Sequence, residues 1–166
     1  MSSIVIKRTT SNDPDFKFLI RLLDQELERR YPSTYQDTHE YDVIKTETNA
    51  VVAYYGKDPV GSGCIRGTDT PGTVEMKRVY VVEGMRRRGV AEAMMGELER
   101  WAIELGWKRA ILETGVKQPE AIALYTKIGY ARIPNFGPYA GADESVCMVK
   151  DLQKHKNKAC KSAPAP

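Results

Sequence analysis

Residues 74–102 read VEMKRVYVVEGMRRRGVAEAMMGELERWA, and this stretch decides the fold that we expect. It predicts a strand that ends near 82, a short loop in which three arginines precede Gly89, and an amphipathic helix from about 91 to 105. The apolar residues of this helix include Ala91, Met94, Met95, Leu98, Ala102 and Leu105. A strand that leads through such a loop directly into a helix N-terminus forms a geometry that binds anions.

The loop at 86–91 has the chemistry of a diphosphate site. The first turn of a helix presents backbone N–H groups without intrahelical partners at the positive end of the helix dipole. Gly89 lets a phosphate approach the backbone because no Cβ is in the way. The forked side chains of Arg86, Arg87 and Arg88 stay protonated and suit phosphate oxygens. A solvated basic patch is the alternative interpretation of three arginines, but their place between strand and helix favours a pyrophosphate.

The flanking sequence predicts alternating strands and helices. Asp13 is the expected N-cap and Pro14 the first residue of a helix that ends near Arg30. The polar segment that follows, to about 49, is expected to be a loop, with or without a short helix. Strands are expected at 4–8, 50–55, 60–66, 73–82, 110–114, 130–133 and 145–151, and further helices at 91–105 and 119–128. This order predicts an α/β (α+β) fold with a mixed sheet.

Length and charge indicate one domain of ordinary composition. The chain has 166 residues, of which 42% are hydrophobic and 28% charged, and its formal net charge is +3. The excess lies in residues 153–166, which hold four lysines (Lys154, Lys156, Lys158 and Lys161) and no acidic residue. We therefore expect a nearly neutral folded domain over 1–152 and a basic, disordered tail over 153–166.

The cysteines indicate a reducing compartment, and the hydropathy of the chain indicates neither secretion nor membrane insertion. Cys64, Cys147 and Cys160 form no CxxC or Cys/His pattern, so neither a disulfide framework nor a metal site is expected. The N-terminus lacks a secretory apolar region, and no apolar run approaches the ~18–20 residues that span a bilayer. These observations predict a soluble, cytoplasmic protein with no membrane partner.

The string RRRGVA at 86–91 fits the pattern [Arg or Gln]-x-x-Gly-x-[Gly or Ala], and here the chain resembles the GNAT superfamily of acetyl-CoA-dependent N-acetyltransferases. The resemblance covers about 4–151 and is closest to small, stand-alone bacterial and fungal members. It implies a mostly antiparallel sheet of about six to seven strands flanked by helices. It also implies that acetyl-CoA is the co-substrate, held by the strand residues Val79, Tyr80 and Val81 and by the loop residues Arg86, Arg87, Arg88, Gly89, Val90 and Ala91. Glu83 departs from the proline that is common before this loop.

A second block, LETGVKQPEAIALYTKIGY at 112–130, is similar to the family's later motif. Gln118 stands where asparagine is usual and can still donate a hydrogen bond to pantetheine carbonyls. The resemblance implies that the Tyr125 hydroxyl lies near the thioester sulfur and acts as general acid toward the leaving thiolate. The alternative is that this tyrosine only packs in the core.

The acceptor amine must lose a proton before it attacks, because its reference pKa is near ~10. Glu75 falls where a glutamate base sits in histone-acetylating members of the family, and Glu113 is the competing carboxylate. A structural ion pair of such an acid with Lys77, Arg78 or Arg109 is the alternative. A backbone N–H of Val79 or Tyr80 is expected to stabilise the oxyanion. Cys64 and Cys147 are expected to be buried, not nucleophilic.

Two loops, 31–41 and 134–144, are expected to wall the acceptor pocket. Tyr31, Tyr35 and Tyr139 are the predicted substrate-contacting residues, and Tyr41 and Phe136 add aromatic surface. The acidic residues Asp37, Glu40, Asp42, Asp143 and Glu144 would favour a cationic amine, unless they are merely solvated turn residues.

Three functions remain open on sequence grounds. The first is transfer of an acetyl group from acetyl-CoA to a small-molecule primary amine, directly within a ternary complex of a monomer or homodimer. The second is acetylation of a protein or peptide lysine or N-terminus, which requires an open groove. The third, a basic nucleic-acid-binding module without activity, is disfavoured because no aromatic stacking residues interleave the arginines. We therefore expect a small-molecule partner and no nucleic acid.

Overall fold

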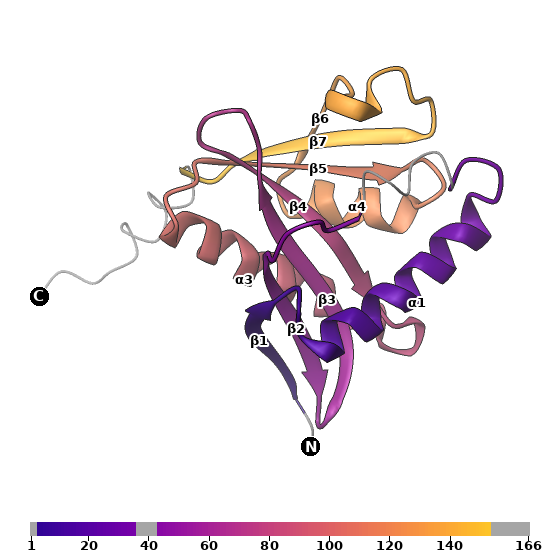
Figure 1. Ribbon diagram of the computed structural model, residues 1–166, viewed down its shortest axis with the longest axis vertical. Coiled ribbons are helices and arrows are strands. Elements are labelled where there is room, and N and C mark those ends of the chain that lie inside the picture. The colour runs from indigo at the N-terminus through magenta and orange to yellow at the C-terminus, as the bar shows by residue number, and fades with distance from the viewer. Residues whose placement is uncertain (1–2, 36–42, 154–166) are drawn as a thin grey trace, which may run out of the picture.

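The computed structural model describes residues 3–35 and 43–153. The strands are β1 (Ile4–Thr10), β2 (Asn49–Tyr55), β3 (Asp58–Gly67), β4 (Thr73–Val81), β5 (Arg109–Gly115), β6 (Ala131–Ile133) and β7 (Ser145–Asp151). The helices are α1 (Pro14–Arg30), α3 (Val90–Glu104) and α4 (Pro119–Lys127), with short 3₁₀ turns η1 (Glu83–Met85) and η2 (Gly137–Tyr139) (Figure 1). The predicted elements are therefore present, with ends displaced by one or two residues and with η2 as an addition inside a predicted loop.

One sheet contains all seven strands, in the order β1-β2-β3-β4-β5-β7-β6. Every neighbouring pair is antiparallel except β4 and β5, which are parallel. The predicted mixed, mostly antiparallel sheet is thus confirmed. The single parallel pair places the ends of β4 and β5 side by side, where the chain leaves each strand toward a helix.

Helices cover both faces of this sheet, and β2 shows why. Its residues from Ala50 to Ala53 are all fully buried although side chains alternate between the faces of a strand. Ala50 and Val52 pack with Phe16 and Leu19 of α1. Val51 and Ala53 belong to the larger cluster on the other face, to which α3 contributes Val90, Met94, Met95, Leu98 and Ala102. Figure 1 shows α1 and α3 on either side of the central strands.

The parallel pairing of β4 and β5 covers only Thr73 to Met76 against Arg109 to Leu112. Farther along, β4 contains an irregularity, because Ser62 pairs with Tyr80 and Cys64 with Lys77, which leaves Gly63 opposite two residues. Arg78 occupies this bulge with a φ of 59°, and its carbonyl accepts a hydrogen bond of 3.1 Å from Ser62 Oγ. A bulge bends the strand that carries it. The two strands therefore diverge toward their C-terminal ends, and the candidate site lies in the opening.

Asp37, Glu40, Tyr41 and Asp42 lie outside the described residues, as does the basic tail from 154 onward. The same gap interrupts the 31–49 loop, for which the sequence left a short helix open. None of the helices within 3–35 and 43–153 is long and apolar enough to cross a membrane.

Asp13 caps α1 as predicted, and this contact generates a stability test. Its Oδ1 accepts from the Asp15 N–H at 2.8 Å, and its Oδ2 accepts from Thr9 Oγ1 at 2.8 Å. Asp13→Ala is expected to lower the free energy of unfolding by about 1 kcal/mol, because a free N–H at the helix start loses its acceptor. Urea denaturation measures the loss; Asn12→Ala, at the exposed neighbouring position, is the matched control and should change stability by less than ~0.5 kcal/mol. Equal losses in both variants would contradict the capping role.

Candidate functional site

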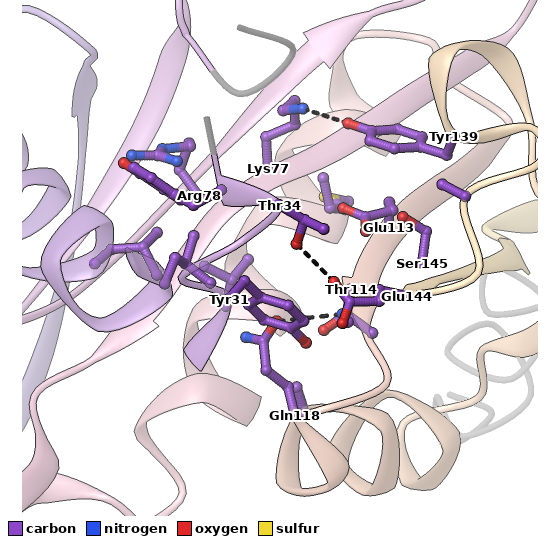
Figure 2. Close-up of a pocket in the computed structure, with 18 of the residues that line it drawn as sticks. Tyr31, Thr34, Lys77, Arg78, Glu113, Thr114, Gln118, Tyr139, Glu144 and Ser145 are labelled. Carbon is purple, nitrogen blue, oxygen red and sulfur yellow. Dashed lines mark hydrogen bonds between the residues drawn. The ribbon is translucent and has the colours of Figure 1, made fainter. Parts of the chain in front are cut away.

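A cavity of about 500 Å³ lies where β4 and β5 diverge. Its walls come from the C-terminal part of α1 and the residues after it, from β4 and β5, from the start of α4 and from the loop that contains η2 (Figure 2). It collects eight residues predicted from the sequence: Tyr31, Tyr35, Glu75, Val79, Glu113, Gln118, Tyr125 and Tyr139. Segments more than a hundred residues apart thus form one site.

Glu75 lies on one wall, almost fully buried, and is held by two cations. Its Oε1 is 2.8 Å from the Arg66 guanidinium and its Oε2 is 3.6 Å from Lys77 Nζ. Among the predicted structural partners, Lys77 is present, whereas Arg78 pairs with Asp24 of α1. Sequence reasoning missed Arg66, which stands opposite Glu75 only through the β3–β4 register. Because both carboxylate oxygens of Glu75 face cations, there is less room beside them for the water molecule that a general base would use.

Glu113 and Tyr125 lie together on the β5–α4 side of the cavity. Burial raises the pKa of the Tyr125 hydroxyl well above its ordinary value, and the Glu113 carboxylate raises it further. The ring meets Tyr130 edge to face, with centroids 5.9 Å apart. Tyr125 therefore keeps its proton at neutral pH and is placed to donate it into the cavity.

The acceptor-side residues are tied to one another across the cavity. Tyr139 is buried, and its hydroxyl accepts a hydrogen bond of 3.0 Å from Lys77 Nζ. Thr34 Oγ1 donates to Glu144 at 2.6 Å, as Figure 2 shows. Burial, with a smaller effect of the Asp24 carboxylate, raises the pKa of Tyr35 to about 12. Thr34 is a wall residue that the sequence did not single out, and Lys77 was expected only as a partner of a carboxylate, not of Tyr139, because only the fold brings these residues together.

Gln118 and Tyr31 meet at the turn between β5 and α4. The Gln118 side chain folds back, so that its Oε1 accepts from the Gly115 N–H at 3.2 Å. Its Nε2 has no acceptor within the described residues and stays available to a ligand. The Tyr31 hydroxyl accepts from the Lys117 N–H at 3.0 Å, so this predicted substrate contact offers its ring, not a free hydroxyl, to the cavity.

The turn before α3 has an open backbone. Gly89 is the N-cap in the left-handed conformation (φ 76°), and a Cβ there would meet nothing within 4 Å. Within the described part of the chain, the N–H groups from Arg87 to Glu92 have no backbone or side-chain acceptor. Arg87 and Arg88 are exposed beside them. This arrangement fits a diphosphate, since the donors converge at a helix N-terminus.

Arg86 differs from its two neighbours. Its Nε donates to the Val81 carbonyl at 2.9 Å, its NH2 group is 2.7 Å from Glu26 of α1, and its guanidinium lies over the Tyr80 ring. The side chain therefore braces the turn against α1. From the sequence we expected it to contact a phosphate, but its donors are engaged within the protein. The Arg86 N–H is occupied as well, because it donates to the Glu83 carbonyl at 3.2 Å, so the open N–H groups of this turn are those from Arg87 to Glu92.

The cysteines that the structure describes are buried thiols. Burial raises the pKa of Cys64 to about 12 and also raises that of Cys147. Neither is poised as a thiolate nucleophile. Among residues 3–35 and 43–153, no group of three or more His, Cys, Asp or Glu side chains could hold a metal ion.

Comparison with known proteins agrees with the fold and the turn. A sequence model described as the Acetyltransferase (GNAT) family matches residues 16–130. A protein of Azospirillum brasilense named IAA acetyltransferase is 32% identical over 155 residues, covering 92% of this chain and all of that one. A provisionally assigned acyl-CoA N-acyltransferase from Klebsiella pneumoniae superposes with a TM-score of 0.74 at 31% identity, over 90% of this chain and 97% of that one.

A third likeness concerns the fold. The N-acetyltransferase PaiA from Thermoplasma acidophilum, solved with coenzyme A, shares the fold at a TM-score of 0.65 and 14% identity, over 90% of this chain and 99% of that one. The family match spans most of the domain and includes both the turn before α3 and Tyr125. We conclude from the family match and from the two relatives above 30% identity that this chain belongs to the GNAT family of acetyltransferases and uses acetyl-CoA as its acyl donor.

Proposed function

We propose that the protein transfers the acetyl group of acetyl-CoA to the primary amine of a small molecule, directly within a ternary complex. The observation that carries this proposal is the cavity between β4 and β5, in which Tyr125 and two carboxylates face the same space. β4 leads from this cavity to the open backbone turn, so a long ligand held at the turn can reach the cavity along the strand.

Hydrogen bonds across the cavity favour a small acceptor. The hydrogen bonds from Lys77 to Tyr139 and from Thr34 to Glu144 join walls that a protein substrate would have to separate. A relative that covers nearly the whole chain bears the name IAA acetyltransferase, which also favours a small molecule. Acetylation of a protein or peptide, which needs an open groove, is the less favoured alternative.

The residues divide the chemistry among them. Acetyl-CoA supplies an acetyl group activated as a thioester. Glu113 takes the proton of the acceptor's ammonium through a water molecule, and Glu75, fixed by Arg66 and Lys77, holds the opposite wall. Tyr125 gives its proton to the sulfur that leaves as the new C–N bond replaces the C–S bond. From the sequence we expected Glu75 to be the general base and Glu113 to be its competitor. We now favour Glu113, because Arg66 and Lys77 face both carboxylate oxygens of Glu75.

Val79 is favoured over Tyr80 as the oxyanion donor. Tyr80 pairs with Ser62 in the ladder with β3, whereas Val79 lies in the bulge without a register partner and beyond the paired part of β5. Val79 also lines the cavity, whereas Tyr80 is not among its lining residues, so the Val79 N–H is the closer donor to a carbonyl oxygen on which charge develops there. Direct transfer is also favoured by the buried, protonated Cys64 and Cys147, since a covalent route needs a thiolate.

Removal of the Tyr125 hydroxyl tests the acid. Tyr125→Phe is expected to lower kcat about 100-fold while the KM for acetyl-CoA changes little, because the proton donor acts only in the transition state. In the unmodified enzyme, the raised pKa of Tyr125 means that the acid stays protonated above pH 10, so no loss of kcat up to pH 10 should come from this group. Thiol release at saturating amine measures both. An unchanged kcat in Tyr125→Phe contradicts the assignment.

A pair of carboxylate variants tests the base. Glu113→Gln is expected to lower kcat/KM for the amine about 100-fold at neutral pH, and less at high pH, where the amine loses its proton unaided. Glu75→Gln, its matched control, should change the pH profile little and act mainly on thermal stability, because it breaks the contacts with Arg66 and Lys77. If instead Glu75→Gln lowers kcat/KM most strongly at neutral pH and Glu113→Gln does not, Glu75 is the general base.

A screen of acceptors tests the function itself. Primary amines of small molecules and lysine-containing peptides of similar charge are compared by thiol release at equal concentration. We expect acetylation of at least one small amine with kcat/KM at least ~10-fold above that of any peptide. Faster turnover of peptides than of every small amine would favour the protein-acetylating alternative.

A further inference from the structure

The turn from Gly115 to Gln118 connects the end of β5 to the start of α4, and distant segments hold its backbone. The Val116 N–H donates to the Glu144 carbonyl at 2.9 Å, and the Gln118 N–H to the Gly115 carbonyl at 3.0 Å. The remaining contacts come from the end of α1. The turn is thus anchored from two sides of the cavity.

Arg30 and Tyr31 provide the anchor from α1. The Tyr31 hydroxyl accepts from the Lys117 N–H at 3.0 Å, and Arg30 NH1 donates to the Lys117 carbonyl at 3.0 Å. The Lys117 ammonium lies 5.2 Å from the centre of the Tyr31 ring, and Arg30 also pairs with Glu120 in the first turn of α4 at 2.5 Å. The backbone N–H and carbonyl of Lys117 are therefore both hydrogen-bonded, to the side chains of the consecutive residues Tyr31 and Arg30.

Gly115 makes this anchor possible. A Cβ at this position would lie 1.7 Å from the Tyr31 hydroxyl oxygen and 2.5 Å from the ring carbon that carries it. The tyrosine therefore passes directly over the backbone of residue 115, at a distance that any side chain would block. We call Arg30, Tyr31, Gly115 and Lys117 the Tyr31 clamp.

α4 depends on such an anchor because it has little apolar burial of its own. Tyr125 is its one buried residue, while Ala121, Ile122 and Leu124 pack only partly against the core. The helix begins at Pro119, directly after the clamped turn, and Tyr125 follows less than two helical turns later. A shift of the turn therefore moves the Tyr125 hydroxyl in the cavity.

We propose that Tyr31 is a positioning residue, which acts through Lys117 and the start of α4 to hold Tyr125 at the reacting sulfur. This proposal rests on the role of Tyr125 in the proposed function. Figure 2 shows Tyr31 between Thr34 and Gln118, so its ring also lines the wall against which an acceptor sits. The clamp therefore connects the acceptor side of the cavity to the acid.

Tyr31→Phe tests the clamp, because it keeps the ring, the Lys117 cation above it and the passage over Gly115, and removes only the acceptor of the Lys117 N–H. Hydrogen exchange at the Lys117 amide should become at least ~5-fold faster, and kcat should fall about 5- to 10-fold with the KM for acetyl-CoA within ~2-fold, as expected for one lost hydrogen bond. Tyr55→Phe, at an exposed position, is the matched control and should change neither quantity.

A double variant separates positioning from a merely structural effect. If Tyr31 acts through Tyr125, Tyr31→Phe should cause no further loss of kcat in the Tyr125→Phe background. Multiplicative losses, or unchanged exchange at the Lys117 amide, overturn the proposal. Should the unmodified chain acetylate no amine, the proposed function fails, and the exchange measurement then decides on the clamp alone.

Discussion

The bulge at Arg78 is the constraint on which the rest of the structure depends. It places a non-glycine residue in the left-handed region within a buried strand and ends the regular alternation of β4. Such conformations cost free energy and persist only where surrounding contacts hold them, here the ion pair with Asp24 and the hydrogen bond from Ser62. With β4 bent away, β5 pairs with it over four residues only, and the cavity occupies the space that further pairing would have closed.

At each of the two ends of the site, a stretch of backbone lacks a neighbour in the sheet or an acceptor for its N–H groups. At one end, β4 beyond Met76 has a sheet partner on one side only. At the other, the N–H groups that begin α3 face outward past a left-handed Gly89. Between them, side chains that carry charge are paired inside the protein, as with Glu75 and Arg86. The two ends of the site thus have open backbone, while most of the buried charges hold the walls.

Local signals in the sequence were sufficient for the elements and for the open turn before α3. Asp13, Pro14 and Gly89 each act within a few residues of their position, so their roles follow from short-range geometry. Partners that depend on strand register or on helix packing could not be read in this way: Arg66 opposite Glu75, Glu26 beside Arg86, and Lys77 beside Tyr139. Tyr31 was predicted as a substrate contact from its aromatic loop, but its contact with the β5–α4 turn was not. Gly115 was the signal for that contact, because a glycine at the end of a strand indicates close approach of another group.

We propose that the open turn before α3 binds the diphosphate of acetyl-CoA, and calorimetric titration can measure this contribution. Coenzyme A and pantetheine, which lacks the diphosphate and the nucleotide, are titrated separately into the protein without an amine. We expect one-to-one binding of coenzyme A with an affinity at least ~10-fold above that of pantetheine, because a single well-placed charged contact would provide this difference. Equal affinities, or no binding of coenzyme A, would contradict it.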